Sequence, residues 1–231
     1  MALFAIGDTH LSFGTDKPMN VFRGWDNYVE RLEENWKKLI GEGDTVVLMG
    51  DISWAMNLDE LREDFRFIDS LPGKKLIMKG NHDYWWNTLT KLNAFVGDNG
   101  FDSISFLFNN AYLVDGIAVC GTRGWFFDSE EAQSDKIVLR ETGRLYTSIR
   151  QAKMLGGEPV AFLHYPPLTK QQQCEPIVKA LRDEGVKYCY YAHLHGASAY
   201  NAFIGTEQGI RFELLSADYL KFCPMPIKLT K

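Results

Sequence analysis

Short apolar runs alternate with helical patterns along the first half of the chain. Residues 25–40 place apolar side chains at helical spacing, and Asn57 with Glu60 forms a capping pair before a second helical segment. Because these segments lie between apolar runs, we expect strand–helix–strand units with right-handed crossovers. The runs that predict strands in this half are residues 2–6, 45–49, 75–79 and 103–108.

The second half of the chain adds hairpin-like strands to this framework. Residues 134–155 and 175–184 have helical patterns, and the apolar runs around them favour additional antiparallel strands. The expected fold is a layered α/β domain, in which a β-sandwich of two mixed sheets is flanked by helices, with a single domain over residues 1–231. The runs that predict strands here are residues 111–114, 117–121, 159–164, 187–193, 199–204 and 209–215.

Composition and charge exclude several classes of protein. The formal net charge of −5 argues against a broad nucleic-acid interface. No apolar run approaches the roughly 20 residues that a membrane-spanning helix needs. The N-terminus lacks the basic segment of a signal peptide. The cysteines are irregularly spaced and form no C-x-x-C pair, so we expect a reducing cytoplasm and no disulfide framework.

The histidines of the chain all follow predicted strands, and in α/β sheets sites form at the carboxyl ends of the strands. Asp8 lies two residues before the first histidine, so both side chains point to the same side of an extended segment. Asp51 follows the second strand, and Asn81 follows the third. The histidines are His10, His82, His164, His193 and His195.

Carboxylate, amide and imidazole groups without cysteine form a ligand set that suits Mn, Fe, Zn or Ni. The set is too large for one ion, but it suffices for two divalent ions if one carboxylate bridges them. Two such ions would outweigh the aspartates and make the site positive inside an acidic protein, which favours an anionic substrate. The candidate ligands are Asp8, His10, Asp51, Asn81, His164, His193 and His195.

The order of these motifs along the chain is specific. D-x-H, G-D, G-N-H-D, H and H-x-H follow one another from Asp8 to His195. This series resembles the calcineurin-like metallophosphoesterase superfamily, in particular a bacterial type of phosphohydrolase. G-N-H-D is its most distinctive part, whereas G-D alone carries no weight. Amidohydrolases differ because they carry H-x-H on the first strand, and here it follows a late one.

The resemblance implies a role for each residue. Asp51 would bridge two ions, and His82 would act as a general acid or stabilise charge beside the leaving group. Asp83 would support the loop or orient His82. The first ion would be held by Asp8, His10 and His195, and the second by Asn81, His164 and His193.

The resemblance also implies a function. We expect a metal-dependent phosphohydrolase with a dinuclear centre, in which a metal-bound hydroxide cleaves a phosphomonoester or phosphodiester of a small phosphorylated substrate. One alternative is a non-catalytic scaffold of the same fold that binds a partner. The other is a nuclease of the same superfamily. The complete ligand set disfavours the scaffold, and the acidic balance without a basic stripe disfavours the nuclease.

Several residues near these motifs are candidates for substrate contacts. Arg123 lies in a glycine-flanked turn and would either clamp a phosphate or pair with a surface carboxylate. Trp54 would stack on a substrate ring, but for the tryptophans as a group we favour packing against the core. Residues 13–24 form an irregular segment that we expect on the substrate side. The arginines at 140, 144 and 150 are interpreted as a solvated helix face.

One position departs from the superfamily pattern. Ala192 stands where a glycine often precedes the H-x-H motif. Alanine is small, so this difference matters only if the backbone at this position needs a positive φ.

Overall fold

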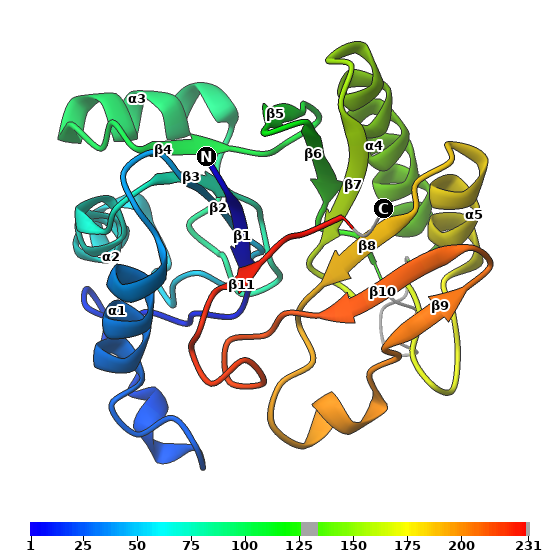
Figure 1. The fold of residues 1–231 in the computed structure, drawn as a ribbon. Coiled ribbons are helices and arrows are strands. Elements are labelled where there is room, and N and C mark those ends of the chain that lie inside the picture. Colours follow the sequence, from blue (N-terminus) through cyan, green and yellow to red (C-terminus); the bar gives the residue numbers. More distant parts are fainter. Residues whose placement is uncertain (126–133, 230–231) are drawn as a thin grey trace.

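The computed structural model describes residues 1–125 and 134–229, and its core is a pair of stacked sheets (Figure 1). The first sheet has the strand order β11-β1-β2-β3-β4. Its first four strands in sequence are parallel, and β11 adds to β1 in the antiparallel sense. The strands are β1 (Leu3–Ile6), β2 (Thr45–Leu48), β3 (Lys74–Ile77), β4 (Ile104–Phe106) and β11 (Met225–Pro226).

The second sheet has the strand order β5-β6-β7-β8-β10-β9. Its four central strands are parallel, and β5 and β9 are antiparallel at the two edges. The expectation of two mixed sheets is therefore confirmed. The strands are β5 (Tyr112–Val114), β6 (Ile117–Thr122), β7 (Glu158–Leu163), β8 (Tyr188–Tyr191), β9 (Gly205–Glu207) and β10 (Ile210–Leu214).

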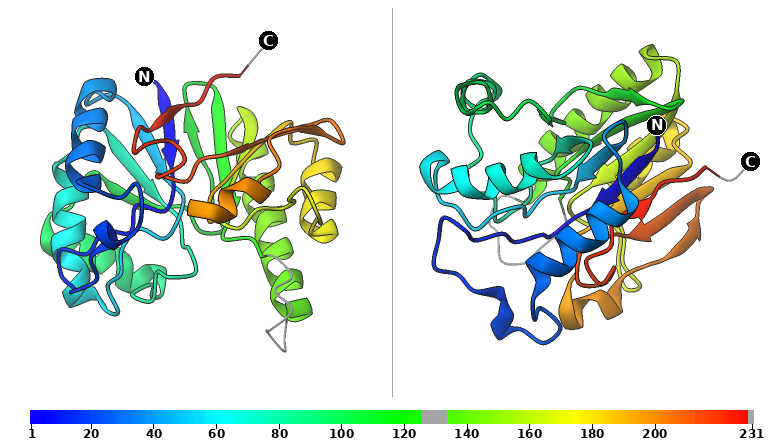
Figure 2. Two further views of the ribbon diagram at one scale, coloured as in Figure 1. Left: turned by 90° about the horizontal axis from the view of Figure 1, so that it is seen from below. Right: turned by 60° about the vertical axis from the view of Figure 1, so that its left-hand side comes forward.

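Helices cover the outer face of each sheet, so the fold has four layers (Figure 2). The first three α-helices pack on the first sheet, and α4 and α5 pack on the second. The helices are α1 (Tyr28–Leu39), α2 (Leu58–Ser70), α3 (Leu89–Asn99), α4 (Ser134–Met154) and α5 (Glu175–Asp183), with short 3₁₀ segments η1 (Met19–Val21) and η2 (Gly196–Asn201). None of these described helices combines the length and the apolarity needed to cross a membrane.

Both faces of the parallel strands are buried. In β1, Ile6 packs toward the helices while Ala5 packs toward the second sheet. In β7, Ala161 faces helices α4 and α5, and Phe162 faces the first sheet. Strands covered on both sides have continuous apolar runs, and this explains why the runs predicted their positions well.

The predicted start of α2 is confirmed in detail. The Asn57 side chain accepts the backbone N–H groups of Asp59 and Glu60, each at 3.0 Å. The Glu60 carboxylate in return accepts the N–H of Met56 at 2.8 Å. These bonds satisfy amides that have no partner within the helix.

Three elements differ from the sequence prediction, and one of them is the two-residue strand β11, which was not predicted. The strand predicted at residues 199–204 is wrong, because residues 196–201 form the 3₁₀ segment η2 and the edge strand begins at Gly205. Tyr200 is 81% exposed and Ile204 is 49% exposed, whereas Ala202 is buried, so these residues do not alternate as a strand would require. Helix α3 was not predicted, since only Leu92 and Phe95 of its residues are buried and the helical pattern is weak.

Candidate metal centre

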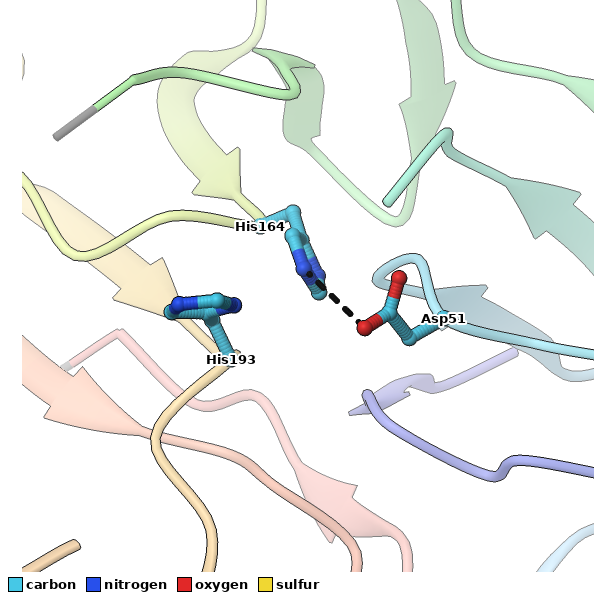
Figure 3. Close-up of side chains that lie close together, drawn as sticks. All are labelled: Asp51, His164 and His193. Carbon is cyan, nitrogen blue, oxygen red and sulfur yellow. Dashed lines mark ion pairs between the residues drawn. The ribbon is translucent and has the colours of Figure 1, made fainter. Parts of the chain in front are cut away.

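The loops that follow β1, β2, β7 and β8 converge between the two sheets. Asp51, His164 and His193 each bring one ligand atom within 4.8 Å of the others (Figure 3). Asp8, His10 and Asp51 form a second group by the same measure. Asp51 belongs to both groups, so its carboxylate lies where the two groups meet.

One oxygen of Asp51 faces histidines on both sides. Its Oδ2 atom lies 3.5 Å from Nε2 of His164 and 3.9 Å from Nε2 of His10. The other oxygen, Oδ1, accepts the backbone N–H of His82 at 2.8 Å. The carboxylate is thus held by one oxygen and presents the other to both groups.

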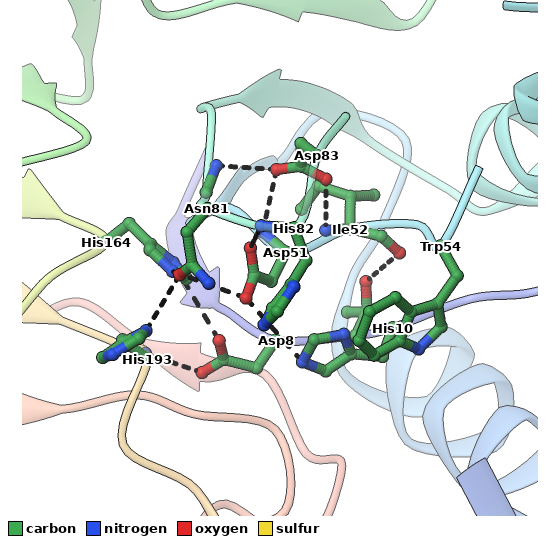
Figure 4. Close-up of polar contacts among 12 residues, drawn as sticks. Asp8, His10, Asp51, Ile52, Trp54, Asn81, His82, Asp83, His164 and His193 are labelled. Carbon is green, nitrogen blue, oxygen red and sulfur yellow. Dashed lines mark hydrogen bonds and ion pairs between the residues drawn. The ribbon is translucent and has the colours of Figure 1, made fainter. Parts of the chain in front are cut away.

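Asn81 lies against the group formed by Asp51, His164 and His193, as Figure 4 shows. Its Oδ1 atom lies 2.7 Å from Nε2 of His164 and 3.0 Å from Nδ1 of His193. The Nδ1 atom of His164 lies 3.0 Å from the carbonyl oxygen of Met49. A ring nitrogen that donates to a carbonyl leaves the other nitrogen with its lone pair free to act as a ligand.

His195 lies beside the group formed by Asp8, His10 and Asp51. It is not a member of that group, whose ligand atoms all lie within 4.8 Å of one another. Its ring is edge-on to that of His10, with 5.4 Å between centroids, and Trp25 lies 6.3 Å from it. The structure therefore brings six predicted ligands into direct proximity and places the seventh next to His10.

The backbone of this site is strained. Asp8, His10, Asp51 and His193 all have positive φ angles, of 57°, 45°, 51° and 72°. The left-handed conformation costs roughly 1–2 kcal/mol for a residue with a Cβ atom. Strained residues of this kind cluster at functional sites, where the surrounding structure enforces them.

Gly50 allows two of the loops to touch. Its φ angle is +88°, and a Cβ atom there would lie only 2.6 Å from the backbone nitrogen of Gly80. No larger residue fits this contact without moving the loop after β3. The glycine of the G-D motif thus brings Asp51 and Asn81 together.

Several buried polar atoms of the site have no hydrogen-bond partner among the described residues. They are Oδ1 of Asp8, both ring nitrogens of His10 and Oδ2 of Asp51. Buried polar atoms are nearly always paired, because leaving them bare costs free energy. Carboxylate oxygens and imidazole nitrogens that converge without partners have the right chemistry for divalent cations, so these residues fit a metal.

Burial shifts the protonation of these groups in opposite directions. It raises the pKa of Asp8 to about 6 and, with the help of the Asp83 charge, raises the pKa of Asp51 well above its usual value. Burial and neighbouring imidazoles lower the pKa of His10 and His164 well below the ordinary value, and that of His193 to about 4. The imidazoles are therefore neutral at pH 7, which is the form that binds metals.

His82 lies at the rim of the site and belongs to neither group. Its ring centroid is 5.9 Å from that of His10 and 4.8 Å from that of Trp54. Its Nδ1 atom is 3.3 Å from the hydroxyl of Tyr84. The side chain is half-buried, so it can reach a molecule that enters from solvent.

Asp83 is fully buried and acts on backbone rather than on His82. Its carboxylate accepts the N–H groups of Asp51 at 2.9 Å, Ile52 at 2.8 Å and Gly80 at 2.6 Å. It also accepts the indole N–H of Trp85 at 3.1 Å. Of the two roles inferred for Asp83, these contacts match support of the loop. The sequence could not reveal which backbone groups it would meet.

Trp54 covers one side of the site. Its ring stacks on His10 with 4.9 Å between centroids and an interplanar angle of 22°. The ammonium of Lys17, in the segment 13–24, lies 5.0 Å from the centre of the same ring. The sequence analysis expected segment 13–24 on the substrate side but singled out neither Lys17 nor Tyr84 as a neighbour of the site. The packing interpretation holds for Trp25, Trp85 and Trp125, which are buried.

Arg123 lies outside the cluster of candidate ligands. Its guanidinium packs 4.9 Å from the ring centre of Trp125 and 6.0 Å from that of Tyr165.

The prediction that the arginines of helix α4 form a solvated face is only partly right. Arg150 is 69% exposed, as a solvated face requires, but Arg144 is partly buried and bonds the fully buried Glu141 at 2.6 Å.

The alanine at position 192, where the superfamily often has glycine, does not require an unusual backbone conformation. Ala192 is not among the described residues with positive φ, and the left-handed residue is the next one, His193. The Cβ atom of Ala192 faces Gly7, where a second Cβ atom would lie only 2.5 Å away. The alanine is therefore accommodated by a glycine on the opposite sheet.

Comparison with protein families gives a clear result. The family model for calcineurin-like phosphoesterases matches residues 1–197. The chain belongs to the calcineurin-like phosphoesterase family. This membership and the two groups of aspartate and histidine side chains support a phosphoesterase-type, metal-binding function. The chain has no significant match among curated proteins.

Solved structures share the fold of this calcineurin-like phosphoesterase. A protein of unknown function from Aquifex aeolicus is 16% identical with a TM-score of 0.51, over 97% of this chain and 95% of that one. A protein from Thermus thermophilus is 11% identical with a TM-score of 0.55, over 90% of this chain and 89% of that one. At these identities the similarity concerns the fold alone.

Proposed function

We propose that this chain hydrolyses phosphate esters of small molecules with the help of two divalent ions. Asp51 would contact both ions, because one of its oxygens faces both groups. The observation that carries the proposal is the set of buried ligand atoms on Asp8, His10 and Asp51 without hydrogen-bond partners. The first ion would be held by Asp8, His10 and His195, and the second by Asn81, His164 and His193.

When bound, such ions supply positive charge for the phosphoryl oxygens and lower the pKa of a water molecule so that it becomes a nucleophile near neutral pH. Mn, Fe, Zn and Ni all suit the donor set. The chain's own part is to orient the ligands. Met49 fixes the His164 ring, and the backbone N–H of His193 holds Oδ2 of Asp8 at 2.9 Å. Oδ1 of Asp8 is left without a partner and is available to a cation.

His82 is the candidate for proton transfer. It is adjacent to the ligand groups, belongs to neither, and faces partly to solvent. We assign it to the leaving-group oxygen, which it would stabilise by donating a hydrogen bond or a proton. Trp54, Tyr84 and Lys17 lie around His82 and would contact the leaving group, with Lys17 providing a positive charge.

The two alternative functions fit the site less well. A scaffold that only binds a partner has no use for converging buried ligand atoms without partners, which cost stability. A nuclease needs a track of basic residues to hold the nucleic-acid backbone, whereas this chain has a formal charge of −5.

The test is Mn²⁺-dependent hydrolysis of bis-p-nitrophenyl phosphate and p-nitrophenyl phosphate. Asp51→Asn is the inactive variant, and Asp98→Asn, which changes an exposed carboxylate on α3, is the matched control. We expect a metal-dependent rate that falls by at least about a hundredfold in Asp51→Asn and persists in Asp98→Asn. The ratio of the two rates assigns the enzyme to diesters or monoesters. A purified protein that binds no metal and cleaves neither ester would overturn the proposal and favour the scaffold.

A further inference from the structure

A cavity of about 240 Å³ lies beside the candidate metal centre and has an unusual concentration of basic residues. It is formed by the loops after β3 and β4, by the end of β6 with the residue that follows it, and by one side of helix α4. No role in metal binding has been assigned to any of these residues. Its charged side chains are Lys79, Arg123, Arg140, Arg144 and Glu141.

Residues that line the cavity lie next to candidate metal ligands. Lys79 lies two residues before Asn81 in the loop after β3. Strands β6 and β7 pair with Thr122 opposite Leu163, so the next residues, Arg123 and His164, lie side by side at the carboxyl end of the sheet. The backbone N–H of Tyr165 accordingly donates to the carbonyl oxygen of Arg123 at 2.8 Å.

Tyr165 lies near both sites. Its ring centroid lies 4.4 Å from that of His193, and the guanidinium of Arg123 lies 6.0 Å from it. The same aromatic ring is therefore close to a candidate metal ligand and to a basic residue of the cavity.

The positive charge of the cavity is only partly neutralised. Glu141 is fully buried, accepts the Thr122 hydroxyl at 2.6 Å and pairs with Arg144 at 2.6 Å and with Arg140 at 3.5 Å. One carboxylate against four basic side chains leaves an excess of three positive charges. Within residues 1–125 and 134–229, Lys79 and Arg123 take part in no ion pair.

A structural explanation accounts for only part of this arrangement. Arg144 neutralises Glu141, and its guanidinium packs 4.9 Å from the ring centre of Phe108, so it has a clear role in stability. Lys79 and Arg123 also line the cavity, and among the ion pairs of the described residues neither has a carboxylate partner of its own. Like charges gathered around a cavity repel one another unless an anion joins them.

We propose that this cavity binds a phosphoryl group. Arginine guanidinium groups form paired, charge-assisted hydrogen bonds with phosphate oxygens, and lysine adds a point charge. The phosphoryl group comes from one of two sources. It belongs to a substrate that carries a second phosphate besides the one cleaved, which rests on the proposed function, or it is free inorganic phosphate.

An adjacent hollow provides space for the remainder of a larger ligand. This hollow has a volume of about 550 Å³ and shares Lys79, Phe108, Asn109 and Arg144 with the basic cavity. Trp86 and Leu89 give it an apolar part. A substrate with two phosphates and an organic body would therefore find charge at one end of this region and an apolar surface at the other.

The first arm of the test measures binding and does not depend on catalysis. Inorganic phosphate is titrated into the metal-loaded protein by calorimetry, for wild type, Arg123→Gln, Arg140→Gln and Arg150→Gln. Arg150 lies on the same helix as Arg140 but outside the cavity, so it is the matched control. We expect two phosphates per chain for wild type and Arg150→Gln, and one for the two cavity variants. Variants that fold as wild type by circular dichroism and bind phosphate unchanged would overturn the proposal.

The second arm separates the two sources of the phosphoryl group. The values of kcat/KM are compared for a nucleoside 3′,5′-bisphosphate and the matched 5′-monophosphate. For a substrate-borne group, we expect the ratio of bisphosphate to monophosphate to fall about ten- to a hundredfold in Arg123→Gln, the loss of one charged hydrogen bond. If Arg123→Gln binds fewer phosphates per chain but keeps the wild-type ratio of the two kcat/KM values, the cavity binds free phosphate. If neither nucleotide is cleaved, the binding arm still decides the cavity, and the p-nitrophenyl esters separately decide the proposed function.

Discussion

The carboxylate of Asp83 accepts the backbone N–H of Asp51 at 2.9 Å, so one aspartate of the G-N-H-D motif positions the aspartate of the G-D motif (Figure 4). The same carboxylate holds the amides of Ile52 and Gly80. Two loops from neighbouring strands are therefore tied together by one buried side chain. The candidate bridging ligand depends on a residue that is not itself among the candidate ligands.

Asp83→Asn should destabilise both the fold and the site. The amide group of asparagine would face a backbone N–H group where the carboxylate oxygen now accepts one, and an unsatisfied buried group costs about 1–3 kcal/mol. We expect the free energy of unfolding in urea to fall by about 2–4 kcal/mol and bound Mn²⁺ to decrease. Asp98→Asn is the control. A variant as stable as wild type would show that the loops are held by other contacts.

His82→Asn should separate catalysis from metal binding. His82 belongs to neither ligand group, so we expect metal content measured by elemental analysis to remain at the wild-type level. Loss of a general acid typically lowers kcat by about 10²–10⁴-fold. Tyr84→Phe, which removes the hydroxyl beside Nδ1 of His82, should have a smaller effect, below about tenfold. Loss of bound metal in His82→Asn would assign this residue to the ligands instead.

The positive φ at Asp8 leads to a prediction about backbone strain. Asp8→Gly and Asp8→Ala both remove the carboxylate, but only alanine retains the Cβ atom that disfavours a φ of 57°. In metal-free protein the glycine variant should be more stable than the alanine variant by about 1 kcal/mol. His164 has no positive φ, so His164→Gly should instead be less stable than His164→Ala by about 0.5–1 kcal/mol. If the glycine and alanine variants had the same order of stability at Asp8 and at His164, the backbone at Asp8 would not be strained.

Buried Lys75 predicts a pH dependence of stability. Its ammonium bonds the Leu71 carbonyl oxygen and, at 3.0 Å, the Ser103 hydroxyl, and burial lowers its pKa to about 8 from the usual 10.5. Between these two values the unfolded chain binds more protons than the folded one, so this group makes unfolding less favourable as the pH rises.

The measurement is the difference in unfolding free energy between wild type and Lys75→Met from about pH 7.5 to 10.5, the range that spans the two pKa values. Above about pH 8 we expect wild type to become more stable relative to Lys75→Met, by up to about 1.4 kcal/mol per pH unit. Lys74→Met is the control, because Lys74 is exposed on the same strand. Parallel curves for wild type and Lys75→Met would rule out the lowered pKa.

The sequence predicted the framework because strands buried on both faces leave continuous apolar runs, and because functional groups follow such strands. It therefore located the candidate ligands in the loops after their strands, including Asn81 and His164. It failed at residues 199–204, where Tyr200 and Ile204 are exposed and the chain forms a 3₁₀ segment up to Asn201. Local pattern reports which residues are apolar, and burial depends on what the rest of the chain covers.

The contacts between distant segments could not be predicted in the same way. The pairing of Thr122 with Leu163 places Arg123 beside His164, and no local signal specifies this register. The approach of Lys17 to Trp54 and the carboxylate of Asp83 beneath the Asp51 loop are further examples. These contacts arise from tertiary packing, and they decide how the ligands are held and what surrounds them.

The candidate metal centre joins the two sheets, and this has a consequence for biosynthesis. Asp8 and Asp51 follow strands of the first sheet, whereas His164 and His193 follow strands of the second. A chain emerging from the ribosome exposes the N-terminal ligands first, and domains mature as their later segments arrive. A nascent chain that ends before β8 therefore holds only part of the candidate centre, so we expect metal to be acquired late in maturation.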